Sequence, residues 1–135
     1  MVGALAGVVA YSTSSNHPRI QNNILVGNAE AGIRSATNTS QHEDHNLLFD
    51  NAGDGASGAA AVLVEDGPDA GVYSPVSPAP SDVLADPMLA DAPGGDMAPG
   101  PAAIDVGVDL GHDRNGGAPG LFNGSAPDLG AVETP

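Results

Sequence analysis

The sequence predicts an all-β protein: a β-solenoid of about three rungs, followed by an irregular C-terminal cap rich in Pro and Gly. The first observation is a hexapeptide that occurs twice, as NILVGN at residues 23–28 and as NLLFDN at residues 46–51. A repeat of this length suits one rung of a solenoid, in which each turn of the chain stacks on the turn before it. The second observation is a shortage of large side chains. The 135 residues include two Phe, two Tyr and no Trp, so the core must be thin and regularly packed.

The two copies of the hexapeptide predict stacked rows of side chains. Matching residues on successive rungs lie above one another at the spacing of hydrogen-bonded strands, about 4.8 Å. The apolar triplets at 24–26 and 47–49 form the strands, and their side chains alternate between the two faces. The flanking Asn residues form ladders at the bends, where side-chain amides bond from rung to rung. The predicted ladder residues are Asn23, Asn46, Asn28 and Asn51.

The chain divides into two predicted parts. Residues 1–66 contain the truncated rungs, and residues 67–135 form a capping segment that packs on the solenoid. Within the first part, we expect a strand at 31–34 and another, in a final coil, within 59–64. The largely polar stretch at 35–43 is expected to bulge from the stack as a loop.

The opening apolar segment, residues 2–10, is predicted to be a buried strand. It resembles the hydrophobic part of a signal peptide, but no basic residue precedes it, and the first one along the chain is Arg19. The segment is also shorter than the roughly 20 apolar residues that a membrane span needs. The residues themselves therefore predict no signal peptide, and they leave the compartment open.

Three short apolar islands interrupt the C-terminal part, whose composition alone is typical of a linker or a disordered tail. They read DPMLAD at 86–91, PAAIDVG at 101–107 and PDLGAVE at 127–133. In this order, and after an Asn-Asn-Ile-Leu rung, they resemble the closing segment of bacterial right-handed parallel β-helix proteins of the pectate-lyase-like superfamily. The residues that match the closing phrases of that family are Asp86, Pro87, Leu89, Asp91, Gly95, Asp96, Pro101, Ala102, Ile104, Asp105, Gly107, Asp128, Gly130, Ala131 and Glu133.

The resemblance covers about residues 16–133 and implies a short right-handed parallel β-helix. It also implies an extracellular or cell-surface location and an association with carbohydrate. Members of the family usually carry many more rungs, so this chain resembles the last turns and the terminal cap of a longer solenoid. An uncapped first rung exposes apolar core and unpaired strand edges, which favour pairing with another chain. We therefore expect self-association through residues 2–10, as a homodimer.

The charge of the chain excludes several partners. It has 17 Asp and Glu against three Lys and Arg, for a formal net charge of −14. Binding to nucleic acids and to anionic membranes depends on Lys and Arg that neutralise phosphates, so neither partner is expected. The same charge disfavours polyanionic sugars, and polysaccharide remains a partner only through the family resemblance.

Two enzyme alternatives follow from the resemblance, a polysaccharide lyase and a glycoside hydrolase. Lyases of this superfamily typically use an Arg or Lys base with calcium, and the chain offers only Arg19, Arg34 and Arg114. A hydrolase needs two carboxylates at a defined separation. Pairs such as Glu43 and Asp44 arise by chance in an acidic chain. A non-catalytic module is therefore the preferred interpretation, and no catalytic residue is assigned.

Two clusters are candidates for a divalent cation, so a cation-binding structural protein is a further alternative. His42, Glu43 and His45 combine imidazoles and carboxylate, and could bind zinc or another divalent ion if the segment folds back. A polar surface loop explains the same residues. Asp113 and Asn115 have part of a calcium-loop spacing but lack the closing Glu. A structural turn explains this pair without a cofactor, and calcium is the cofactor that the alternative requires.

Three Asp residues of the C-terminal islands are predicted to have a structural role. Asp86, Asp105 and Asp128 each stand beside a turn residue. A carboxylate at such a position accepts backbone amide protons and fixes the bend. We therefore interpret them as cap turns and not as catalytic groups.

Overall fold

The computed structural model describes residues 6–10, 18–35, 42–65, 71–91, 94, 96–111 and 122–134. In this part of the chain the protein is all-β, which confirms the predicted class: short strands, two three-residue 3-10 helices and no α-helix. None of its helices is long or apolar enough to cross a membrane. The candidate calcium residues Asp113 and Asn115 lie outside the described residues, as do residues 2–5 of the opening segment.

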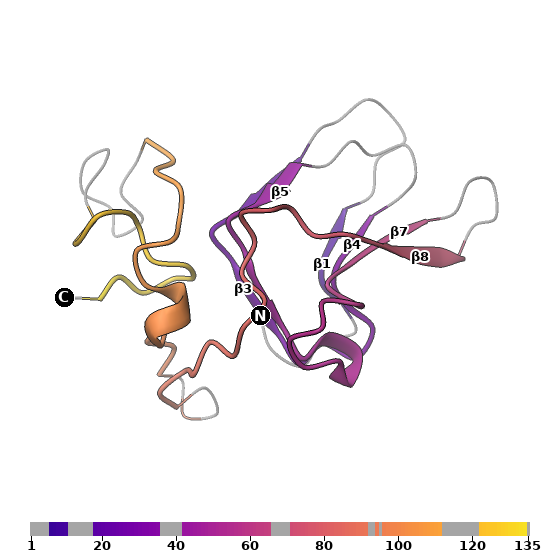
Figure 1. Ribbon diagram of the computed structural model, residues 1–135, viewed down its shortest axis with the longest axis horizontal. Coiled ribbons are helices and arrows are strands. Elements are labelled where there is room, and N and C mark those ends of the chain that lie inside the picture. Colours follow the sequence, from indigo (N-terminus) through magenta and orange to yellow (C-terminus); the bar gives the residue numbers. More distant parts are fainter. Residues whose placement is uncertain are drawn as a thin grey trace.

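Three small sheets carry the fold (Figure 1). The strands are β1 (Ala6–Ala10), β2 (Arg19–Gln21), β3 (Ile24–Val26), β4 (Ala31–Ser35), β5 (His42–Asp44), β6 (Leu47–Phe49), β7 (Val62–Glu65) and β8 (Tyr73–Val76). The first sheet has the order β1-β4-β7-β8, and the others pair β2 with β5 and β3 with β6. All pairings are parallel except that of β7 with β8.

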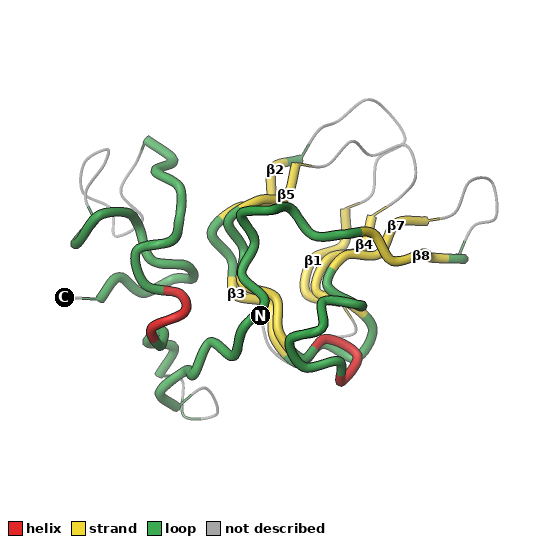
Figure 2. Tube along the Cα trace, in the orientation of Figure 1, coloured by secondary structure: helices red, strands yellow, loops and turns green. Residues whose placement is uncertain are grey.

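The chain visits the three sheets in the same order twice. We call β1, β2 and β3 the first pass, and β4, β5 and β6 the second pass; Figure 2 shows their strands side by side. The register of β3 and β6 is the one that the hexapeptide predicts. Its pairs are Ile24 with Leu47, Leu25 with Leu48, and Val26 with Phe49.

A third pass begins at β7, which lies parallel to β4 and overlaps the region 59–64 predicted for a final coil. The chain then turns back as β8, antiparallel to β7, before residues 81–84 reach the β3–β6 sheet. There Val83 forms a parallel bridge to Leu47, accepts the Leu48 N–H at 2.9 Å and donates to Asn46 O at 2.7 Å. Residues 82–84 thus take the place of the first three residues of the repeated phrase.

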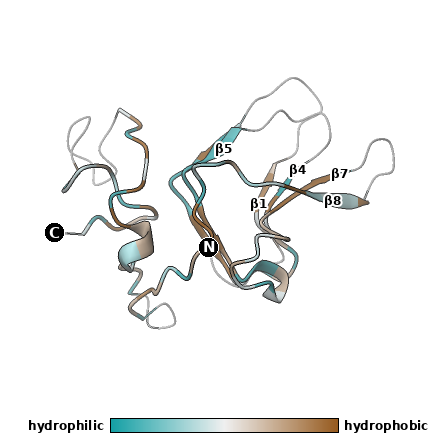
Figure 3. Cartoon of the chain, in the orientation of Figure 1, coloured by the Kyte–Doolittle hydropathy of each residue, from teal (hydrophilic) through white to brown (hydrophobic). Residues whose placement is uncertain are grey.

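The predicted loop at 35–43 is wrong at both ends, because Ser35 is the last residue of β4 and β5 begins at His42; residues 36–41 lie outside the described residues. His42 and Glu43 belong to β5, where they lie opposite Arg19 and Ile20 of β2. The parallel partner strand offers backbone hydrogen bonds whatever the side chains are, so a polar sequence can complete the sheet here. Figure 3 shows the contrast between hydrophilic β5 and hydrophobic β7.

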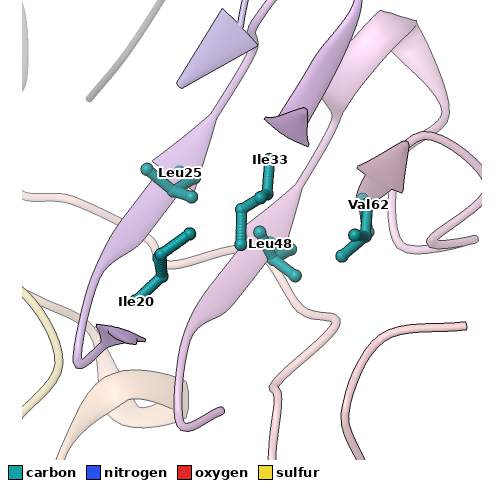
Figure 4. Close-up of a cluster of buried hydrophobic side chains, with 6 residues drawn as sticks. Ile20, Leu25, Ile33, Leu48 and Val62 are labelled. Carbon is teal, nitrogen blue, oxygen red and sulfur yellow. The ribbon is translucent and has the colours of Figure 1, made fainter. Parts of the chain in front are cut away.

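The hydrophobic core lies on both faces of the β3–β6 sheet. On the inner face Leu25 and Leu48 pack with Ile20, Ile33 and Val62 (Figure 4). The neighbouring side chains of the same strands alternate to the outer face. There they form a second cluster, whose buried members are Ile24, Leu47, Ala103 and Leu129. Because β3 and β6 have apolar side chains on both faces, the outer face also has to be covered, and the C-terminal segment covers it.

We call the chain after the third pass, from residue 86 on, the C-terminal segment. Its described residues form turns, an isolated bridge between Asp91 and Asp96, and the 3-10 helix Pro101–Ala103. It lies beside β3 in Figure 1, where Ala103 and Leu129 are fully buried. The backbone joins these two residues, since the Leu129 N–H donates to Ala103 O at 2.8 Å. The segment thus covers the side of the stacked strands.

Candidate functional site

The most regular polar feature is a pair of Asn ladders between the first and second passes. Asn46 Oδ1 accepts the backbone N–H of Asn23 at 3.2 Å and its Nδ2 at 3.0 Å. Asn51 Oδ1 accepts the backbone N–H of Asn28 at 3.3 Å and its Nδ2 at 2.8 Å. Asn28, Asn46 and Asn51 are at most 1% exposed, so these bonds satisfy amides that water cannot reach.

Asp82 extends the first ladder by one step. Its Oδ1 accepts the backbone N–H of Asn46 at 2.8 Å and its Nδ2 at 3.3 Å. Its Oδ2 accepts the Ala79 N–H at 3.0 Å. Sequence analysis missed this residue because the spacing from Asn46 to Asp82 is 36 residues, whereas that from Asn23 to Asn46 is 23. The signal that could have found it is the short phrase DVL, which matches NIL and NLL.

The ladder ends in an acidic corner formed by Glu43, Asp44 and Asp82. Burial raises the pKa of Asp82, against the hydrogen bonds from Asn46 and Ala79, and the charge of Asp44 raises it further. Burial likewise raises the pKa of Glu43, against a hydrogen bond from its own backbone, and the charges of Asp82 and Asp44 add to the effect. The carboxyl groups of Asp82 and Glu43 are therefore harder to ionise than carboxyl groups in water.

The predicted metal residues do not converge in this corner. Adjacent residues of a strand point to opposite faces, so His42 and Glu43 of β5 point apart. His45 follows the strand in a left-handed conformation, with φ 50°, and its Nδ1 lies 3.4 Å from Asp44 Oδ1. Among the described residues, no three His, Asp or Glu side chains are placed to hold one metal ion.

Arg34, a candidate base for a lyase, is already paired on the outer face of β4. Its Nη1 lies 2.6 Å from Glu30 Oε2, and its guanidinium lies 4.8 Å from the centre of the Tyr73 ring. The ion pair and the cation–π contact together hold the guanidinium of Arg34 against Glu30 and Tyr73. Arg19 is exposed on β2, and Arg114 lies outside the described residues.

The three cap Asp residues accept backbone N–H groups. Their donors are Met88 for Asp86 (2.8 Å), Ser125 and Ala126 for Asp105 (2.8 and 3.2 Å), and Asp105 and Thr134 for Asp128 (2.9 and 2.7 Å). Asp105 and Asp128 are linked in series, because the N–H of one donates to the carboxylate of the other. The two carboxylates thereby join three turns of the C-terminal segment.

Asn22 attaches the C-terminal segment to the stacked strands, a role that sequence analysis missed. Its Nδ2 donates to Val108 O at 2.7 Å, and its Oδ1 accepts the Val108 N–H at 2.8 Å. Its backbone oxygen accepts the Gly130 N–H at 2.8 Å. Asn22 is 1% exposed and has φ 57°, a left-handed conformation that Asn tolerates better than most residues. Of these two neighbours, Asn22 thus binds the C-terminal segment and Asn23 belongs to the ladder.

A pocket of about 220 Å³ lies where the first pass meets the C-terminal segment. It is lined by Asn22, Asn23, Ile24, Leu89, Met97, Gly130 and Ala131. Most of this lining is apolar, and both amide donors of Asn23 are used, by Gln21 O at 2.8 Å and by Asn46. No acid–base pair faces the pocket among its lining residues.

Comparison of the chain with protein-family models, curated proteins and solved structures finds no match. The chemistry of the candidate site therefore rests on its geometry. Asp82, Asp105 and Asp128 all accept backbone N–H groups, and the Asn residues bond from pass to pass. This arrangement holds turns in place.

Proposed function

We propose that this chain is the terminal part of a right-handed parallel β-helix of the pectate-lyase-like type, and that it works as a non-catalytic module. In this proposal the first, second and third passes are successive rungs, and the C-terminal segment is the cap. The parallel pairings, the Asn ladders and the repeated order of the strands support this interpretation. The resemblance of the closing phrases to that family supports it independently of the geometry.

The single observation that carries the proposal is Asp82 at the end of the ladder. A carboxylate only accepts hydrogen bonds, so Asp82 needs no acceptor on a following rung, whereas Asn51, the last residue of the other ladder, donates its amide back to Leu25 O at 3.1 Å. Asp82 accepts the backbone N–H and the side-chain amide of Asn46, and its carboxylate has no hydrogen-bond donor that would need a partner on another rung. A residue of this kind is suited to ending a stack.

The polar side chains of the candidate site are bound to other groups of the protein, which supports a non-catalytic role. A general acid or nucleophile has to reach a substrate atom, and Asp82 is held by Asn46 and Ala79 instead. Arg34 is likewise occupied by Glu30. Carbohydrate is the ligand class that the family resemblance implies, and the charge of −14 makes neutral glycans the first candidates.

Hydrogen exchange followed by mass spectrometry tests the architecture. The amides of Asn23, Asn46 and Val83 belong to three successive rungs in this proposal, so we expect them to be protected together and to open together. Rapid exchange at Val83 beside strong protection at Asn46 would contradict a ladder that continues to Asp82.

Incubation of the purified chain with neutral and acidic polysaccharides tests the absence of catalysis. We expect no release of reducing ends and no unsaturated product. Turnover that Glu43→Gln abolishes, while Asp109→Asn on the exposed surface leaves it intact, would establish an enzyme and overturn the proposal. Binding of a neutral glycan without turnover would agree with a carbohydrate-associated module.

A further inference from the structure

The pocket between the first pass and the C-terminal segment owes its space to two small residues. Beside it, Ala103 and Leu129 fill the interface and are fully buried. The residues that follow Leu129 are Gly130 and Ala131, and they bring almost no side chain to the wall of the pocket. A Cβ at Gly130 would lie 3.1 Å from Ile24 Cδ1. Larger side chains at these two positions would therefore occupy the space that the pocket leaves open.

The other walls of the pocket are apolar and adaptable. Ile24 and Leu89 contribute branched aliphatic side chains, and Met97 contributes an unbranched thioether. Met adapts to irregular shapes, and its sulfur makes favourable contacts with aromatic rings. Ala131 is exposed, so the pocket opens to the surface on that side. A small molecule can therefore enter while the C-terminal segment stays packed on the strands.

One polar side-chain atom of the lining has no hydrogen-bond partner. Asn22 uses both its side-chain oxygen and its nitrogen on Val108. Asn23 uses its Nδ2 on Gln21 O and on Asn46 Oδ1. The Oδ1 of Asn23 accepts no hydrogen bond from any residue that the structure describes. Because a carbonyl oxygen of this kind only accepts, the ligand that matches it has to bring a donor.

We propose that this pocket binds a small uncharged aromatic molecule with one hydrogen-bond donor, of the size and chemistry of a phenol. A dry apolar cavity of about 150 Å³ holds benzene. The pocket has about 220 Å³, which leaves room for a ring with a substituent. Asn23 Oδ1 accepts the hydroxyl proton, and Ile24, Leu89 and Met97 contact the ring.

Charged ligands and sugars fit the pocket less well. No ionisable residue lines it, so a charged group would lose its hydration without gaining a partner. The net charge of −14 disfavours anions further. A monosaccharide carries several hydroxyl groups that each need a partner, and one free acceptor satisfies only one of them. The pocket is thus distinct from a carbohydrate surface, and the inference does not rest on the proposed function.

Methyl NMR of the whole protein, labelled at the Met and Ile methyl groups, tests the site with controls that the chain itself supplies. Phenol is added near neutral pH, where its hydroxyl is uncharged. We expect saturable shifts of the Met97 and Ile24 signals. The signals of Met88, which is 67% exposed and outside the lining, and of Ile33, which is buried on the inner face, should stay in place. Equal shifts at all four residues, or no saturable shift at Met97 and Ile24, would overturn the inference.

Anisole separates the hydrogen bond from the apolar contact, because it has the same ring and an oxygen without a proton. We expect anisole to bind about 3- to 10-fold more weakly than phenol, and equal affinities would overturn the proposed ligand class.

Two substitutions at exposed positions locate the site. Ala131→Leu places a larger side chain in the wall of the pocket, so the phenol-induced shifts should be lost. Val132→Leu changes the next residue, which is exposed and outside the lining, and should leave the shifts intact. Phenol binding that is unchanged in Ala131→Leu would overturn the assignment of the ligand to this pocket.

Discussion

Asn46 donates its backbone N–H and its side-chain amide to one oxygen of Asp82, at 2.8 and 3.3 Å, across 36 residues of sequence. The same two groups of Asn23 bind Asn46 across 23 residues. The exchange of Asn for Asp at the last step ends the ladder without leaving a donor unpaired. It also places a carboxylate in a partly buried corner beside Asp44, and so links the stability of the stack to pH.

The first prediction is that the protein is more stable at mildly acidic pH than at neutral pH. The pKa values of Asp82 and Glu43 are raised above 3.8 and 4.5, so the folded state binds these protons more tightly than the unfolded state. Their contribution is fully present below those ordinary values and is lost as the pH rises through the raised ones. We expect the free energy of unfolding, measured with urea, to fall as the pH rises above the ordinary carboxyl range of about 4 to 4.5.

Two variants identify the source of this pH dependence. Glu43→Gln and Asp82→Asn each remove one carboxyl group with a raised pKa, so each should flatten the slope of stability against pH. Asp109→Asn is the matched control, because Asp109 is exposed and outside the acidic corner. A slope that is unchanged in both corner variants would contradict the assignment.

The second prediction concerns the central ladder residue. Asn46→Ala removes the donors to Ile20 O at 2.8 Å and to Asp82, and it removes the acceptor of Asn23. Because Asn46 and Ile20 are buried, the substitution leaves the Ile20 carbonyl without a partner away from water, and we expect a loss of about 2–4 kcal/mol in the free energy of unfolding. The control Asn123→Ala removes an exposed bond to Thr134 O and should cost less than about 1 kcal/mol. Similar losses of unfolding free energy in Asn46→Ala and Asn123→Ala would contradict the prediction.

The sequence predicts the pairing of β3 with β6 well because the two copies of the hexapeptide are close and alike. An apolar triplet between Asn residues specifies both a strand and its register, and the pairing of Leu25 with Leu48 follows directly. The third copy differs, since Asp82 replaces Asn and the β7–β8 hairpin lengthens the spacing. The inserted hairpin does not prevent the strands from stacking. It changes the spacing between the copies, and a constant spacing is how a repeat is recognised in a sequence.

The candidate site was less predictable, because its polar residues act through partners distant in sequence. His42 and Glu43 look like a loop cluster until β2 provides the parallel edge that makes them a strand. Nothing in the sequence around Asn22 predicts its hydrogen bond to Val108, which lies 86 residues away. The turn roles of Asp86 are local, and such contacts with the next residues can be read from sequence.

The third prediction is that Asn22 controls the attachment of the C-terminal segment. Asn22→Gly keeps the left-handed backbone accessible and removes both side-chain bonds to Val108. We expect amides of 101–108 and 127–130 to exchange faster, while those of β6 and of Asn46 stay protected. Hydrogen exchange with peptide-level resolution measures both. Equal acceleration in β6 and in the cap would mean that the two unfold as one unit, contrary to the prediction.

The fourth prediction separates two reasons for a glycine. A Cβ at Gly32 would lie 2.9 Å from the backbone oxygen of Ala61 and 2.7 Å from Leu48 Cδ2, because β4 and the third pass approach closely there. Gly32→Ala should therefore lower the free energy of unfolding by about 1–3 kcal/mol through overpacking. Gly27 has open space around its Cβ position but a φ of +61°, so Gly27→Ala should cost about 1 kcal/mol through backbone strain alone.

A test of the mechanism behind this difference uses Asn at the same two sites. Asn tolerates the left-handed conformation, so Gly27→Asn should recover much of the stability that Gly27→Ala loses. Gly32→Asn is larger than Gly32→Ala and should be worse, because the backbone of Ala61 cannot move aside without breaking the Ile33 N–H bond to Ala61 O at 2.8 Å. Urea unfolding of the four variants decides the point. If Asn improved both positions, the close approach of β4 to the third pass would not limit the side chain at residue 32.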